Sequence, residues 1–279
     1  MTHNRSSLRR PAAVLCLLLA VSALASVVAA QGSDTVLRGF QRTGDFVLFV
    51  NDKHVPAAEV YVNDKIPAYL ILTSALPTPV MLTPRARTVE SVHIMKVAKQ
   101  KDGSVDLLAD ATLDLLGSFQ IEGSDVNFTV QGRKASLKVR PPLLGLKRNA
   151  DLKTYNPEFA RSAQAYAPNP QMIAALKKSA KPAKVRVYFG SWCPHCKRHV
   201  PFILRVEDEL KGSKIQFEYV GLDRGLPEPD VKRLNLNGVP TGIVYVDGKE
   251  VGRILDNDWN SPETSLNRIL NGGGTRSGR

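Results

Sequence analysis

The sequence predicts two folded domains of different class, a β-rich domain followed by an α/β domain whose mixed sheet is flanked by helices. The chain has 279 residues, which is more than one typical domain holds. Residues 31–148 consist of short β-branched or aromatic runs separated by glycine-containing and Asn-Asp breaks. Residues 169–271 instead alternate strand-like and helix-like patterns, which is typical of an α/β sheet. The hydrophobic content of 43% excludes a disordered chain.

The first thirty residues are predicted to be a signal peptide. Three arginines and no acid precede an uncharged run over 12–30, which ends in the small residues Ala29 and Ala30. Cleavage near Ala30 would release a periplasmic or otherwise exported chain. The alternative is a retained membrane anchor, because 12–30 is close to the minimum length of a membrane-spanning helix. Either interpretation places the remainder outside the cytoplasm.

The net charge of +12 falls to +9 once the three arginines of the leader are removed. This charge favours weak contacts with acidic surfaces. Aromatic residues make up only 6% and the basic residues are dispersed, so the stacking and phosphate-binding pattern of a nucleic-acid site is missing. We expect no nucleic-acid partner.

The β-rich domain, 31–148, is predicted to form an antiparallel sheet or small sandwich. The segments "VNDKHVPA" (50–57) and "VNDKIPA" (62–68) repeat after twelve residues, as successive strands of a meander closed by Asn-Asp turns would. His54 and His93 have no cysteine, histidine or acidic cluster around them, so we expect no metal there. This domain could recognise a partner or mediate dimerisation.

Residues 149–168 are polar and are predicted to be a connector that includes a short helix around 157–166. In 169–271 a short helix precedes the strand "VRVYF", and the motif "CPHC" then opens a longer helix. A second strand and helix, two strands joined by an Asp-Gly turn, and a last helix complete the domain. Residues 272–279 are predicted to be a flexible tail.

Cys193 and Cys196 are the only cysteines outside the leader. Cys193 falls at a predicted helix start, where free N–H groups and the positive helix end favour a thiolate. Pro194 suits the first helical turn, and Cys196 lies three residues on, on the same face and within disulfide reach. A structural staple is disfavoured because so short a loop constrains the unfolded chain little. A zinc site is disfavoured because no second ligand pair follows. We therefore predict a redox-active disulfide, with no metal and no cofactor.

His195 indicates the direction of electron flow. A partly protonated imidazole beside Cys193, with Lys197 nearby, would stabilise the thiolate. Stabilising the reduced form makes the disulfide a better oxidant. We therefore expect an oxidase or isomerase, and keep open a reductant of the kind used in cytochrome maturation.

The stretch "VYFGSWCPHCK", followed by "GVPT", resembles the thioredoxin-like family over about 171–270. The resemblance implies a thioredoxin fold acting on protein thiols and disulfides, with a membrane-bound or soluble partner that recycles the disulfide. It implies supporting roles for Trp192 before the first cysteine, Pro201 in the active-site helix, and Val239 with the cis-proline Pro240. The Pro-His dipeptide resembles that of DsbA-type disulfide oxidases, although the chain lacks their long helical insertion.

One residue departs from the family pattern. The family commonly has a buried acid six residues before the first cysteine, where this chain has Val187. His199 could handle the proton instead, or could be an exposed helix residue. The missing acid also leaves open a non-catalytic module that binds partners through the β-rich domain.

Overall fold

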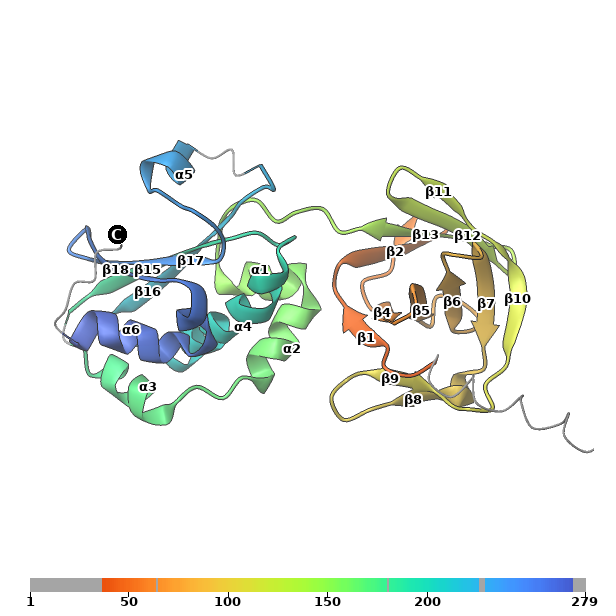
Figure 1. Cartoon of the computed structure of the whole chain (residues 1–279), viewed down its shortest axis with the longest axis horizontal. Helices are drawn as coiled ribbons and strands as arrows, with labels where there is room; N and C mark the ends of the chain where they lie inside the picture. The colour runs from red at the N-terminus through yellow and green to blue at the C-terminus, as the bar shows by residue number, and fades with distance from the viewer. Residues whose placement is uncertain (1–36, 64, 180, 226–228, 273–279) are drawn as a thin grey trace, which may run out of the picture.

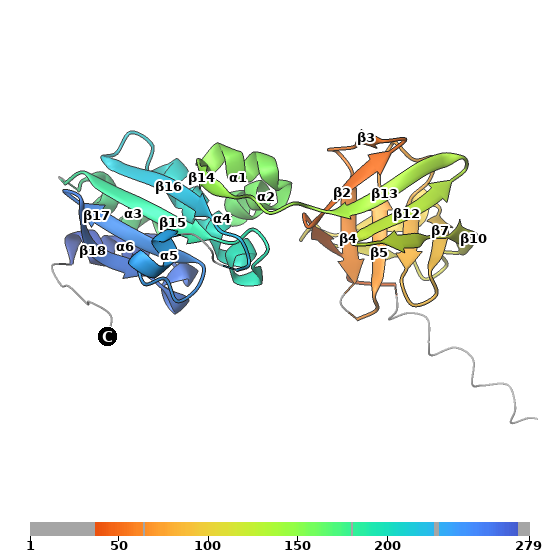
Figure 2. The same cartoon turned by 90° about the horizontal axis from the view of Figure 1, so that it is seen from above.

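The computed structural model describes residues 37–63, 65–179, 181–225 and 229–272. The predicted signal peptide, and all but the first residue of the predicted tail, lie outside these residues. The described chain forms two lobes joined by one extended segment (Figures 1 and 2). No helix in the described ranges combines the length and apolar character needed to cross a bilayer.

The N-terminal lobe is a β-sandwich, which confirms the prediction of a β-rich domain. Its larger sheet has the order β1-β4-β5-β6-β7-β10 and its smaller sheet the order β11-β12-β13-β2-β3; all pairings are antiparallel. The strands of the larger sheet are β1 (Gln41–Thr43), β4 (Glu59–Asn63), β5 (Ala68–Leu72), β6 (Val80–Thr83), β7 (Thr88–Val92) and β10 (Leu113–Ser118). Those of the smaller sheet are β2 (Phe46–Val50), β3 (Lys53–His54), β11 (Gln120–Glu122), β12 (Asp125–Val130) and β13 (Arg133–Val139). A turn of 3-10 helix, η1 (Ile94–Lys96), leads into the separate ribbon of β8 (Val97–Lys99) and β9 (Val105–Leu107).

Alternation along the strands places apolar side chains on both faces of the larger sheet. Leu48, Ile71 and Phe128 belong to the core between the two sheets. Leu70, next to Ile71, points to the opposite face and packs with Val105 of the β8–β9 ribbon. The lobe therefore has two apolar layers.

The two repeated segments do not form one meander. Asn51 and Asp52, at φ 49° and 63°, make the predicted Asn-Asp turn between β2 and β3. The second copy, however, joins β4 to β5 in the other sheet. The difference arises because a local turn sequence determines a hairpin but does not determine which sheet that hairpin joins.

The C-terminal lobe has a five-stranded mixed sheet of order β14-β16-β15-β17-β18, in which only β15 and β16 are parallel. Its strands are β14 (Gly145–Lys147), β15 (Ala183–Phe189), β16 (Ile215–Gly221), β17 (Thr241–Val246) and β18 (Lys249–Ile254). Its helices are α1 (Asn149–Tyr155), α2 (Pro157–Ala165), α3 (Pro170–Lys177), α4 (Pro194–Glu209), α5 (Pro229–Arg233) and α6 (Pro262–Asn271), with the 3-10 turn η2 (Asp256–Asn260) before α6. In Figure 1, α3, α4 and α6 lie on one side of the sheet and the short α5 on the other.

The C-terminal lobe begins earlier than the composition indicates. β14, assigned by its sequence to the β-rich domain, pairs with β16. The polar segment 149–168 is helical over most of its length: α2 confirms the short helix expected around 157–166, and α1 was not predicted. Their buried residues Leu152 and Phe159 belong to the core beneath the sheet. Two apolar side chains in a polar segment are too few to reveal this packing without the tertiary structure.

Candidate redox site

The cysteine pair lies at the junction of β15 and α4. Cys193 is the N-cap residue of α4, with an extended backbone, and Pro194 occupies the first helical position. Gly190 is needed in the preceding turn, because a Cβ there would lie 2.6 Å from the Trp192 ring. Pro201 lies inside α4 and is buried. The local sequence therefore delivers both sulfurs to the start of one helix.

The two sulfurs have different surroundings. Cys193 is 8% exposed, whereas Cys196 is fully buried. The Cys193 sulfur lies 3.6 Å from the Val239 carbonyl oxygen, to which its thiol form can donate, and the Gly190 N–H donates to the Cys196 sulfur at 3.4 Å. Cys193 is therefore the sulfur that a partner can reach, as expected for an attacking and resolving pair.

These surroundings separate the acidities of the two thiols. Hydrogen bonding from the Cys196 thiol lowers the pKa of Cys193 to about 5, with further contributions from backbone N–H groups at the helix start and from the charge of His195. Burial opposes this shift. Burial also raises the pKa of Cys196 well above its usual range. At neutral pH, Cys193 is therefore a thiolate and Cys196 a thiol.

His195 and His199 lie one turn apart on α4, with parallel rings whose centroids are 6.3 Å apart. The His199 ring meets the edge of Phe202 at 5.6 Å, and its Nδ1 is buried without a hydrogen-bond partner. Burial lowers the pKa of His199, so the ring is neutral at pH 7. Proton transfer by His199 stays a prediction.

Val187 is fully buried in β15, in the same apolar core as Cys196. The position that holds an acid in many thioredoxin-like proteins is therefore occupied here by a packed isopropyl group. This substitution removes a proton acceptor from the interior and adds to the desolvation that keeps Cys196 protonated.

A second loop completes the site. The Val239–Pro240 peptide bond is cis, and the Pro240 carbonyl accepts from the indole N–H of Trp259 at 3.0 Å. The Trp192 indole N–H donates to the Leu222 carbonyl at 2.9 Å. The chain thus brings Val239 to Cys193 and holds Trp192 beside it, although 46 residues separate the two contacting positions.

The structure adds neighbours that sequence reasoning missed. Lys197 forms an ion pair of 2.6 Å with Asp45 of the N-terminal lobe. Ser191 accepts through its hydroxyl from the Leu143 N–H at 2.9 Å, and the Arg224 guanidinium lies 5.3 Å from the centre of the Trp192 ring. Ser191 and Lys197 belong to the motif itself, whereas Asp45, Leu143 and Arg224 approach it only through tertiary folding, so no local pattern signals those three. Within the described ranges, no group of three or more His, Cys, Asp or Glu side chains is placed to hold a metal ion.

The family comparison agrees with this geometry. Residues 169–268 match the family model described as Thioredoxin. The C-terminal domain is thioredoxin-like. A thioredoxin-like domain with these two cysteines supports thiol–disulfide oxidoreductase function in general terms. No curated protein matches the chain.

The similar solved structures include several thioredoxins of low sequence identity. Mitochondrial thioredoxin 3 from Saccharomyces cerevisiae, in its oxidized form, is 18% identical over 39% of this chain and 96% of its own, with a TM-score of 0.26. Thioredoxin f2 from Chlamydomonas reinhardtii is 17% identical over 37% and 92%, with a TM-score of 0.28. Thioredoxin O2 from Arabidopsis thaliana is 19% identical over 38% and 91%, with a TM-score of 0.27. At these scores the family assignment rests on the matched residues and the observed strand order.

Proposed function

We propose that the protein is an exported thiol–disulfide oxidoreductase that acts on protein thiols, either as an oxidase, which accepts their electrons, or as an isomerase, which rearranges disulfides without net electron transfer. The observation that carries this proposal is the pKa of about 5 for Cys193, set against a buried and protonated Cys196. The Pro-His dipeptide of DsbA-type oxidases supports the same direction.

The acidity of Cys193 gives an expected reduction potential. Thioredoxin has a cysteine pKa of about 7 and a potential of about −270 mV, and DsbA has values of about 3.5 and −120 mV. Lowering the pKa from about 7 to about 5 stabilises the reduced form at pH 7 and raises the potential by about 30–50 mV, allowing for solvent screening. The potential is therefore expected to lie above that of thioredoxin, which suits disulfide exchange better than strong reduction.

In the oxidative half-reaction, a substrate thiolate attacks the Cys193 sulfur of the Cys193–Cys196 disulfide. The bond between the two cysteines breaks, and Cys196 leaves and takes up a proton because its thiol is strongly favoured. A second substrate thiolate then attacks the substrate sulfur of the mixed disulfide and releases Cys193 as a thiolate. Two electrons pass to the protein, and a disulfide or quinone-linked partner must remove them.

Equilibration with glutathione tests the direction. We expect a potential above that of thioredoxin, and a value of about −270 mV or lower would contradict an oxidising role. The Cys193→Ser variant is expected to lose thiol oxidation and insulin reduction, whereas unchanged activity would exclude the catalytic interpretation. Export is tested by N-terminal sequencing of the chain isolated from its own cells, with cleavage expected near Ala30.

A further inference from the structure

A cavity of about 250 Å³ lies between the two lobes, beside the cysteine motif. Both lobes contribute to its walls. Phe46, Val139 and Arg140 come from the sandwich, and Trp192, Lys197 and Arg224 from the thioredoxin-like domain.

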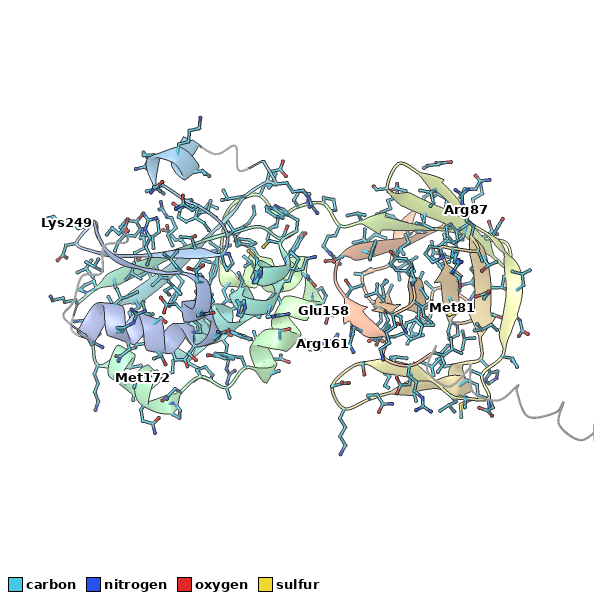
Figure 3. All side chains as sticks on the ribbon, viewed as in Figure 1. Met81, Arg87, Glu158, Arg161, Met172 and Lys249 are labelled. Carbon is cyan, nitrogen blue, oxygen red and sulfur yellow. The ribbon has the colours of Figure 1, made fainter. Side chains whose placement is uncertain are left out.

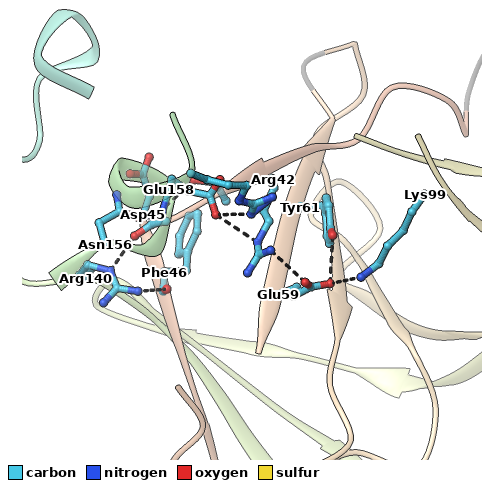
Figure 4. A network of polar contacts seen from close by, with 12 residues as sticks. Arg42, Asp45, Phe46, Glu59, Tyr61, Lys99, Arg140, Asn156 and Glu158 are labelled. Atoms are coloured by element: carbon cyan, nitrogen blue, oxygen red, sulfur yellow. Dashed lines mark hydrogen bonds and ion pairs between the residues drawn. The ribbon is translucent and has the colours of Figure 1, made fainter. Parts of the chain in front are cut away.

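Close packing fixes the sandwich wall of this cavity. A Cβ on Gly44 would lie 1.8 Å from the side-chain oxygen of Asn156, so the lobes approach within a distance that only glycine permits. The Arg140 guanidinium donates to the Gly44 carbonyl at 2.6 Å and to the Tyr155 carbonyl at 2.7 Å. Arg140 follows β13, and Gly44 lies between β1 and β2, so these two bonds connect the sandwich to the end of α1. Figure 4 shows Arg140 beside Asn156 and Phe46.

Two ion pairs also connect the sandwich to the thioredoxin-like domain. Asp45 pairs with Lys197 on α4 at 2.6 Å, and Arg42 pairs with Glu158 on α2 at 3.1 Å. Glu158 and its neighbour Arg161 lie on the side of α2 that faces the sandwich (Figure 3). Both contacts place the sandwich against helices of the redox domain.

The cavity shares its wall with the redox site. Trp192 immediately precedes Cys193, and Lys197 immediately follows Cys196. Arg224 lies over the Trp192 ring. A segment bound in the cavity would therefore lie beside the residues that flank both sulfurs.

The lining indicates the kind of ligand. The volume is below the range of about 300–1,000 Å³ typical of small-molecule and cofactor sites. Phe46, Tyr155 and Trp192 supply aromatic surface, while Asp223 and Arg224 supply charges of both signs. A cavity of this volume and mixed lining suits one side chain and the adjoining backbone amide of a longer polypeptide segment better than a single anion.

We propose that this cavity is a substrate subsite, in which the N-terminal sandwich binds the polypeptide segment next to the cysteine that reacts with Cys193. The inference rests on the proposed oxidoreductase function. It assigns the sandwich a role in choosing polypeptide thiols over small thiols, because only a polypeptide thiol has a flanking segment that the cavity can bind.

Filling the cavity from the sandwich side tests the proposal. Val139 is 50% exposed at the end of β13, so the Val139→Trp variant adds bulk to the cavity without altering either core. Leu115→Trp is the matched control, because Leu115 is also an exposed strand residue of the sandwich and does not line the cavity. The oxidised full-length proteins are reacted in single turnovers with a reduced two-cysteine peptide and, separately, with glutathione.

We expect Val139→Trp to lower the ratio of peptide reactivity to glutathione reactivity at least about fivefold. The loss should appear as a higher half-saturating concentration of the peptide. Leu115→Trp should leave the ratio unchanged. An unchanged ratio in Val139→Trp overturns the subsite, as does an equal loss with both thiols, which would place the effect on the cysteines. Arg224→Ala, on the opposite wall, must also lower the ratio. If the unaltered protein oxidises neither thiol, the proposed function itself has failed, and that result is distinct from an unchanged ratio.

Discussion

Replacing Cys196 by alanine is expected to raise the pKa of Cys193. The hydrogen bond from the Cys196 thiol is the largest contribution to the low pKa of about 5, ahead of the backbone N–H groups and His195. Alanine removes this donor and leaves the helix start, with its free N–H groups, in place. The Cys193 thiolate therefore loses one stabilising contact and keeps the others.

The size of the effect follows from the strength of a charged hydrogen bond. Hydrogen bonds to charged groups contribute about 1.5–3 kcal/mol, and 1.36 kcal/mol corresponds to one pKa unit. We therefore expect the titration midpoint of Cys193 to rise by about one to two pH units in Cys196→Ala. The Cys196→Ser variant keeps an O–H donor at the same place and is expected to retain most of the low pKa.

The midpoint is measured by thiolate absorbance against pH and by the pH dependence of alkylation with iodoacetamide. The midpoint is the appropriate quantity, because the intrinsic nucleophilicity of a thiolate rises with its pKa and partly offsets a loss of thiolate at any single pH. Two results would refute the reasoning: an unchanged midpoint in Cys196→Ala, or equal shifts in the alanine and serine variants.

Three further predictions concern stability. Folding lowers the pKa of Cys193, so the thiolate stabilises the reduced protein at high pH, and this stabilisation is lost as the pH falls towards 5. Relative to Cys193→Ser, the free energy of unfolding in urea should fall by about 1–2 kcal/mol between pH 7 and pH 5, and parallel pH profiles of the two proteins would contradict this. Gly44→Ala should displace the side chain of Asn156, which caps α2, and loosen the junction of the lobes; faster limited proteolysis between intact lobes is expected, and wild-type rates would contradict it. Glu263 is 2% exposed and accepts from the Tyr166 hydroxyl at 2.7 Å, so Glu263→Ala should lower the free energy of unfolding by about 2–4 kcal/mol, with an unchanged urea midpoint as the contrary result.

Local patterns allowed most of the redox site to be predicted. The alternation of strand and helix over 169–271 predicted the mixed sheet, and the position of the cysteines after "VRVYF" predicted the start of α4. The Asp-Gly turn between β17 and β18 lies where its sequence indicates, with Asp247 at φ 50°. Each of these features depends on residues that are close in the chain, so their composition carries the information.

The boundary between the lobes could not be predicted in the same way. β14 follows the extended segment of the sandwich and resembles it in composition, yet it pairs with β16. The segment 149–168 is polar on most faces, and only the tertiary structure shows that Leu152 and Phe159 are buried. Pairing partners and burial depend on which distant surfaces meet, which local composition does not encode.

The sequence by itself determined that Cys193 and Cys196 lie at a helix start in a thioredoxin-like domain, because strand, turn and helix signals act over a few residues. The tertiary structure alone decided how acidic each thiol is, since burial and hydrogen bonding differ between two sulfurs only three positions apart. It also decided that Asp45 and Arg140, far away in the sequence, stand beside the motif. Such contacts form only when the two lobes pack against each other, because the residues that meet at the junction are distant in the chain.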